Sequence, residues 1–236
     1  MVKLQHHAVI IVGGGPGGLG VAATLEGWHP IFQGNYQFPS KEVQAFAKAN
    51  ENNPLAFDPH ALLALGHRPI EFYRMRHHPQ QDALPIDQWT LKFQKKTRVD
   101  WKMLTTDGPG GLWNNVPKEQ MTLGPAHWME LSHYPIGKFY EDTGRKRNLN
   151  HLAHRDDLVL YYHAFAKKLG LNEHIKKGVE VTSISPAENN STANFIVESA
   201  NHENGINSKY SCDFIVFAIG PRSKIRTLNA EGVNQD

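Results

Sequence analysis

The chain has 236 residues, of which 40% are hydrophobic, so it can form one large domain or two small ones around a real core. Its 25 basic and 23 acidic side chains give a formal net charge of +2, so nothing in the charge favours nucleic acid or an anionic membrane as the main partner. No apolar run approaches the roughly 18 residues that a membrane-spanning helix needs. A single cysteine, Cys212, and the lack of a convincing signal peptide favour a reducing compartment, so we expect a cytoplasmic protein.

The first predicted elements are a strand over residues 8–12 and a helix over 17–25. The strand is apolar, partly β-branched and followed by glycines, which is typical of a strand buried on both faces of a parallel sheet. Gly13, Gly15 and Gly18 give the spacing G-x-G-x-x-G between strand and helix. Such glycines permit a tight turn, a close approach of pyrophosphate and close packing of the helix on the strand, respectively. The free N–H groups of the helix N-terminus favour the anion, so a dinucleotide pyrophosphate is predicted here.

The glycine spacing by itself does not distinguish NAD, NADP and FAD. No Gly-Lys-Ser/Thr follows, which excludes a Walker-type phosphate loop. An acidic residue that binds the ribose is expected about 20 positions further on, at the end of the second strand. The sequence there reads "WHPIFQGNYQF" and contains no acid. Gln33 or Asn35 is left as a neutral hydrogen-bonding partner for the ribose, or a residue elsewhere binds it.

The next segments are predicted from their breakers and periodicity. Residues 36–100 mix short helical patterns with prolines that stop them, so an irregular helical insertion is expected. "HRDDLVLYYHAFAKKLGL" predicts a helix capped by Asp156 or Asp157, with Leu158, Tyr162, Phe165 and Leu169 on one face and Gly170 at its end. Strands are expected over 179–184, 194–199 and 209–220. Together these elements predict an α/β fold with a doubly wound parallel sheet, a helical insertion and a small antiparallel β-meander near 179–211.

Two further glycine-containing segments are candidates for the same site. In "DGPGGLWNNV", Gly110 and Gly111 allow the backbone to approach a flat ligand and Trp113 supplies a wall, although a Pro-Gly turn with a core tryptophan explains the pattern too. In "FIVFAIG", a buried strand is expected to end in Ala218-Ile219-Gly220, where Gly220 allows close approach.

Other polar patterns give no catalytic or metal site. The fourteen histidines include pairs at 6–7 and 77–78 and an H-x-x-H at 151–154, but no third ligand accompanies them, and no metal is predicted. "GRKRN" at 144–148 is suited to a phosphate or an acidic partner, yet its place before a capped helix favours a solvated loop. No Ser-His-Asp or Cys-His arrangement can be argued, so catalytic residues stay unknown.

Four segments in this order carry a resemblance: "VIIVGGGPGGLG", "GPGGLW", "DDLVLYYHAFAKKLGLNEHIKKGVEVTSI" and "FIVFAIG". They are similar to the FAD-binding half of flavin-dependent monooxygenases, and most closely to the oxidative stress-induced growth inhibitor family, from about Val9 onward. The resemblance implies a Rossmann-type FAD-binding domain. By that likeness the FAD pyrophosphate lies on Gly13, Gly15 and Gly18, with Pro16 and Gly17 in the same turn, Gly110, Gly111 and Trp113 border the flavin, and Ala218 to Gly220 join the two halves.

The same resemblance implies an FAD-binding flavoprotein of the NADPH-dependent monooxygenase type, linked to growth regulation after oxidative stress. A non-catalytic regulatory module with protein partners, and a plain NAD(P)-binding Rossmann protein, are the alternatives. The family pattern places a second glycine-rich turn, for NADPH, after "FIVFAIG", but the sequence ends 16 residues beyond Gly220. The resemblance therefore implies one FAD-binding domain over 1–236, with a βαβ start at 8–35, the insertion at 36–100, the remainder at 101–220 and a tail at 221–236 toward a missing NADPH domain. NADPH is expected as electron donor only if a further domain or a partner binds it.

Overall fold

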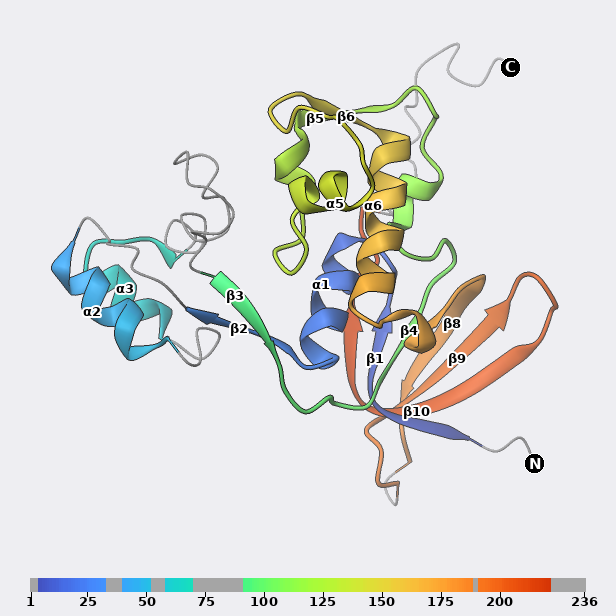
Figure 1. Cartoon of the computed structure of the whole chain (residues 1–236). Coiled ribbons are helices and arrows are strands. Elements are labelled where there is room, and N and C mark those ends of the chain that lie inside the picture. Colours follow the sequence, from blue (N-terminus) through green and yellow to red (C-terminus); the bar gives the residue numbers. More distant parts are fainter. Residues whose placement is uncertain (1–3, 33–39, 52–57, 70–90, 189–190, 222–236) are drawn as a thin grey trace, which may run out of the picture.

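The computed structural model describes residues 4–32, 40–51, 58–69, 91–188 and 191–221 (Figure 1). The strands are β1 (Gln5–Val12), β2 (Trp28–Phe32), β3 (Leu91–Lys95), β4 (Trp101–Leu104), β5 (Met121–Pro125), β6 (Leu152–His154), β7 (Ile175–Lys176), β8 (Val179–Pro186), β9 (Phe195–Asn201) and β10 (Asn207–Phe217). The α-helices are α1 (Pro16–Leu25), α2 (Lys41–Ala49), α3 (Pro59–Ala64), α5 (Ile136–Asp142) and α6 (Arg155–Lys168). Short 3₁₀ turns are η3 (Gly111–Asn114), η4 (Ala126–Met129) and η5 (Asn172–His174).

A six-stranded mixed sheet forms the centre of the fold, in the order β7-β4-β1-β10-β9-β8. β1 is parallel to both β4 and β10, and β4 is parallel to β7, so four strands form a parallel core. β9 is antiparallel to both β10 and β8. The predicted α/β class and the predicted β-meander are therefore confirmed, and β10 is the strand that joins the meander to the parallel core.

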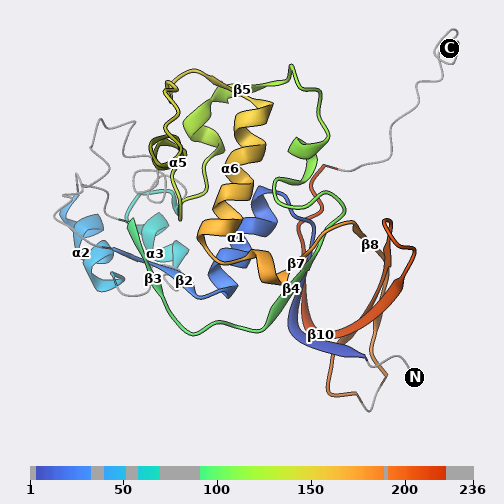
Figure 2. The ribbon, with the colours of Figure 1, turned by 45° about the vertical axis from the view of Figure 1, so that its right-hand side comes forward.

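The two faces of this sheet are covered differently. α1 and α6 lie on one face, as Figures 1 and 2 show, and their side chains share a core with Val9, Ile11 and Met103. The alternating residues of the strands point the other way. There Ile10 and Leu104 pack with residues of β8, β9 and β10 rather than with a helix. Within the described residues the sheet is thus not doubly wound: the meander, not a second helical layer, buries the other face.

The second strand of the predicted βαβ start over 8–35 does not join this sheet. β2 pairs in antiparallel fashion with β3 in a separate two-stranded sheet, and Figure 1 shows α2 and α3 beyond this pair. The place beside β1 is taken by β4, with Trp101 opposite Val9. Pro30 lies within β2 and lacks the N–H that a central strand needs, whereas β4 buries Trp101, Met103 and Leu104. The insertion therefore precedes the strand that neighbours β1.

α6 confirms the predicted helix but not its predicted cap. Its N-cap residue is His154, and Asp156 and Asp157 lie in the first turn. Asp157 is buried, and its two carboxylate oxygens contact Arg145 Nη1 at 2.8 Å and Arg147 Nε at 3.0 Å, so it is not used as a cap. The four residues predicted to share a face, Leu158, Tyr162, Phe165 and Leu169, are all buried. Gly170 follows the helix with a φ of +73°, as a glycine at a helix end commonly does.

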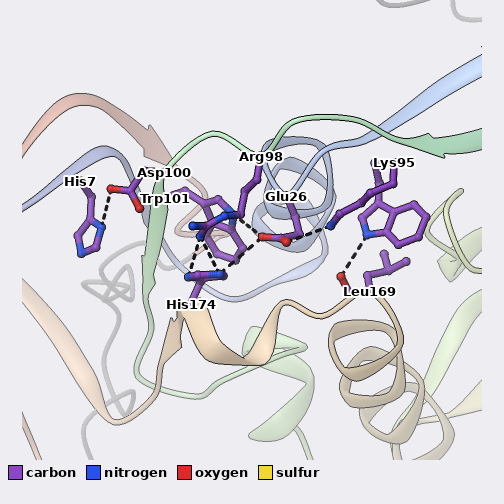
Figure 3. Close-up of polar contacts among 9 residues, drawn as sticks. His7, Glu26, Lys95, Arg98, Asp100, Trp101, Leu169 and His174 are labelled. Atoms are coloured by element: carbon purple, nitrogen blue, oxygen red, sulfur yellow. Dashed lines mark hydrogen bonds and ion pairs between the residues drawn. The ribbon is translucent and has the colours of Figure 1, made fainter.

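A buried carboxylate connects the end of α1 to β4 and to the segment before it (Figure 3). Glu26 Oε2 accepts a hydrogen bond of 3.1 Å from the buried Trp101 indole, and its Oε1 accepts one of 3.0 Å from Lys95 Nζ. The His174 ring lies 3.7 Å from Glu26 Oε2 and also contacts Arg98. Burial and then the charge of Arg98 lower the pKa of His174, so it stays neutral near pH 7.

Replacing Glu26 is expected to destabilise the fold. Glu26→Ala leaves the buried Trp101 N–H without its acceptor, so we expect the free energy of unfolding to fall by about 2 kcal/mol. Urea unfolding followed by tryptophan fluorescence measures this change. Glu51→Ala, on an exposed glutamate after α2, serves as the control and should leave stability nearly unchanged. Equal midpoints for both variants would contradict a structural role for Glu26.

Candidate functional site

A cavity of about 460 Å³ lies at the carboxyl ends of the parallel strands β1, β4 and β10. This edge of an open α/β sheet is where ligands bind in such folds. The cavity brings together all three glycine-containing segments that the sequence singled out. Its lining includes Gly13, Gly15, Pro16, Gly110, Gly111, Trp113, Ala218 and Gly220 of the predicted set.

The three motif glycines have different surroundings. A Cβ on Gly13, whose φ is +107°, would lie 2.3 Å from the Ala218 carbonyl oxygen, so only glycine fits where the turn meets β10. A Cβ on Gly18 would lie 2.2 Å from the Gly13 carbonyl oxygen, so this glycine lets α1 pack on the turn. A Cβ on Gly15 would meet no atom within 4 Å. Gly15 is thus the motif position with open space beside it, and it precedes the first turn of α1.

The "GPGGLW" segment packs directly on the glycine turn. Gly110 N–H donates a 2.8 Å hydrogen bond to the Gly14 carbonyl oxygen. A Cβ on Gly111 would lie 2.9 Å from the Gly15 Cα atom. Gly111 is therefore required by the close approach of two backbone segments of the protein. The sequence interpretation had attributed this glycine to the approach of a flat ligand.

Trp113 is half-buried, and it both packs against the main core and lines the cavity. The sequence left open whether Trp113 is a wall of the ligand site or a core residue, and in the structure the side chain takes both positions at once. Its position is fixed from α6, because Arg155 Nε donates a 3.0 Å hydrogen bond to the Trp113 carbonyl oxygen. Arg155 Nη2 also donates to the Asn114 carbonyl oxygen, so one guanidinium contacts the last two residues of η3.

The remaining predicted residues lie outside this lining. Gly17 is exposed in the first turn of α1, and Gly18 is buried beneath the turn. Gln33 falls outside the described residues.

Ala218, which lines the cavity, connects two strands of the sheet. Its N–H donates a 2.9 Å hydrogen bond to the Val12 carbonyl oxygen, which links the end of β10 to the end of β1.

Sequence reasoning missed the polar residues after β4. In dinucleotide-binding folds the acidic residue that binds the ribose follows the strand beside the first one, and here that strand is β4. Thr105, Thr106 and Asp107, which follow β4, line the cavity. Asp107 Oδ1 accepts a 2.7 Å hydrogen bond from Asn115, and Thr105 Oγ1 accepts one of 3.2 Å from Gly108 N–H. The sequence signal for Asp107 was the strand "WKML" followed shortly by an acid. The search for a ribose-binding acid about 20 residues after the glycines stopped far short of this segment.

In the part of the chain that the structure describes, no group of three or more His, Cys, Asp or Glu side chains is placed to hold a metal ion. No helix in the same residues is long and apolar enough to cross a membrane.

No protein-family model matches the chain. Human oxidative stress-induced growth inhibitor 2 is 24% identical over 189 residues, which cover 75% of this chain and 36% of that protein. The Caenorhabditis elegans oxidative stress induced growth inhibitor homolog osgn-1 is 22% identical, covering 75% of this chain and 40% of that protein. This chain is a distant relative of the oxidative stress-induced growth inhibitors. It spans about two fifths of the length of these relatives, and the resemblance stated from sequence is confirmed.

Solved structures show the same relation at the level of fold. Bacillithiol disulfide reductase Bdr from Staphylococcus aureus superposes with a TM-score of 0.52 and 15% identity, covering 98% of this chain and 43% of that one. The closed structure of cyclohexanone monooxygenase gives a TM-score of 0.50 and 15% identity, covering 96% of this chain and 28% of that one. This distant growth-inhibitor relative thus shares part of its fold with these two enzymes.

Proposed function

We propose that this chain binds FAD in the cavity at the ends of β1, β4 and β10. The observation that carries the proposal is the contrast among the motif glycines. Gly13 and Gly18 are explained by protein atoms that would lie 2.3 and 2.2 Å from an added Cβ, whereas Gly15 faces open space. A glycine that no protein atom requires, in front of a helix N-terminus, is suited to a phosphate that comes close to the backbone.

The chemistry of the surrounding residues fits a dinucleotide. The first turn of α1 holds no acidic residue, so its N–H groups and partial positive charge are available to a pyrophosphate. Asp107, at the end of β4, is positioned to accept hydrogen bonds from a ribose. Trp113 supplies apolar surface on one wall. FAD, when bound, would supply redox chemistry, and the chain would bind the cofactor, orient it and limit its access to water.

The finer function that we propose is a flavoprotein of the NADPH-dependent monooxygenase type that acts in growth regulation under oxidative stress, and the names of the relatives support the part on growth and stress. A regulatory protein on a flavoprotein fold is the second candidate, and a plain NAD(P)-binding protein is the third. FAD is proposed as the cofactor in the first two, and NADPH as electron donor only where a further domain or partner binds it. No residue of this chain is assigned as a catalytic acid or base.

The proposal is tested by the absorbance spectrum of the purified chain and by calorimetric titration with FAD, NADH and NADPH. The flavin bands and tight binding of FAD alone are expected. Binding of NADH or NADPH without FAD would overturn the proposal in favour of a plain nicotinamide-binding protein. FAD binding without reduction of the bound flavin by NADPH would favour the regulatory candidate.

The ribose contact is tested by Asp107→Ala. Loss of a charged acceptor for a ribose hydroxyl should weaken FAD binding about tenfold, measured by calorimetry. Asn115→Ala is the matched control, because it removes the 2.7 Å partner of Asp107 but keeps the carboxylate. Only the aspartate variant should lose affinity. Equal losses would indicate that the Asp107–Asn115 bond matters for loop shape rather than for the ribose.

A further inference from the structure

A second cavity, of about 650 Å³, lies between the β5–β6 pair, the start of α6 and the loop that contains "GRKRN". It shares no lining residue with the cavity at the glycine turn. Its lining is Met121, Ala126, Tyr140, Lys146, Arg147, Asn148, Asn150, His151, Leu152, Ala153, His154 and Asp157. The loop that the sequence interpretation placed in solvent thus forms one wall of a concave site.

The charges at this cavity do not cancel. Among the described residues that line it, Asp157 is the one acidic residue, and both of its carboxylate oxygens already contact guanidinium groups, those of Arg145 and Arg147. Arg147 makes its contact through Nε at 3.0 Å, which fixes its side chain and leaves its two terminal nitrogens available. Lys146 lines the same cavity and is exposed. Among the described lining residues, Lys146 and Arg147 against Asp157 leave an excess of positive charge.

An aromatic side chain that carries a hydroxyl also lines this cavity. Tyr140 is only 4% exposed and lines the site. Burial first, and then the charge of Asp157, raise the pKa of Tyr140 to about 12, so its hydroxyl keeps its proton at neutral pH. A protonated phenol is a hydrogen-bond donor, so it is suited to an acceptor in the cavity. Met121, Ala126 and Leu152 supply the apolar part of the lining.

We propose that this second cavity binds a small organic anion, with its carboxylate or phosphate group at Lys146 and Arg147 and its apolar body against Met121 and Leu152. The cationic groups and the Tyr140 hydroxyl donate to the anion, and the apolar wall selects against a fully hydrated inorganic ion. Asp157 does not contact the anion: it is a positioning residue that orients Arg147. The site is separate from the proposed FAD site, so it does not depend on flavin binding.

Calorimetric titration at constant ionic strength tests the proposal with three probes: 4-phenylbutanoate, its neutral amide and inorganic phosphate. The purified chain is used both with and without added FAD. We expect 4-phenylbutanoate to bind more tightly than the amide and than phosphate alone, in both conditions. Equal affinity for acid and amide would overturn the anionic specificity, and phosphate binding as tight as that of the acid would overturn the apolar part. A Kd above about 10 mM for all probes would overturn the site itself.

Variants locate the binding. Lys146→Met should weaken 4-phenylbutanoate binding about tenfold, and Tyr140→Phe about fivefold, with unchanged affinity for FAD. Lys167→Met is the matched control, because Lys167 is an exposed lysine at the far end of α6. If Lys167→Met lowers the affinity as much as Lys146→Met, the effect is one of net charge and the proposed location is wrong. Failure of FAD to bind while 4-phenylbutanoate binds would overturn the proposed function only.

Discussion

Gly15→Val is expected to abolish FAD retention while the ligand-free protein keeps its fold. The Cβ position of Gly15 meets no atom within 4 Å, and its backbone is extended with a φ of −71°, so the backbone accepts an L side chain there and we expect valine to be tolerated. The same side chain would fill the space in which pyrophosphate oxygens must lie. We expect the affinity for FAD to fall by at least about 100-fold.

The measurement pairs flavin content with stability. The ratio of flavin absorbance to protein absorbance in the purified variant reports retention, and calorimetry reports the residual affinity. Thermal unfolding of the FAD-free protein, followed by circular dichroism, should match that of the parent chain. Gly15→Ala provides a graded step, with a smaller loss of affinity. A Gly15→Val protein that retains FAD as tightly as the parent would show that the pyrophosphate lies elsewhere.

Gly18→Ala is expected to have the opposite effect, a large loss of stability that does not depend on ligand. The added Cβ would lie 2.2 Å from the carbonyl oxygen of Gly13, a backbone atom that cannot turn aside as the end of a flexible side chain can. α1 would have to move away from the end of β1, which opens the core that Leu19, Ala22 and Ala23 form with the sheet. We expect the free energy of unfolding to fall by about 3 kcal/mol or more.

Gly20→Ala is the matched control in the same helix. Its Cβ position meets no atom within 4 Å, so the substitution should raise stability by about 0.5–1 kcal/mol through helix propensity alone. Urea unfolding of both variants without FAD gives the comparison. Similar stabilities for the two variants would mean that the turn relaxes around Gly18, and that close packing is not why glycine stands there.

The elements that the sequence predicted well are those with strong local signals. The strand before the glycines, the helix after them and α6 each carry an uninterrupted pattern bounded by glycine, and local propensity agrees with the tertiary environment there. The strands of the meander are separated by polar turns, so their positions in the chain were also predictable. Gly13, Gly15 and Gly18 identified one end of the candidate site because their spacing between a strand and a helix is itself a local pattern.

Local patterns in the sequence were thus sufficient for the individual elements, the α/β class and the glycine turn, together with a resemblance that the comparisons confirmed. Which strand lies beside β1 was decided by the tertiary structure alone. That pairing depends on contacts between residues about 90 positions apart in the chain, Val9 and Trp101 among them, which no local pattern encodes. It placed Asp107 at the glycine cavity, and packing between distant segments likewise turned the basic loop before α6 into the wall of a second cavity.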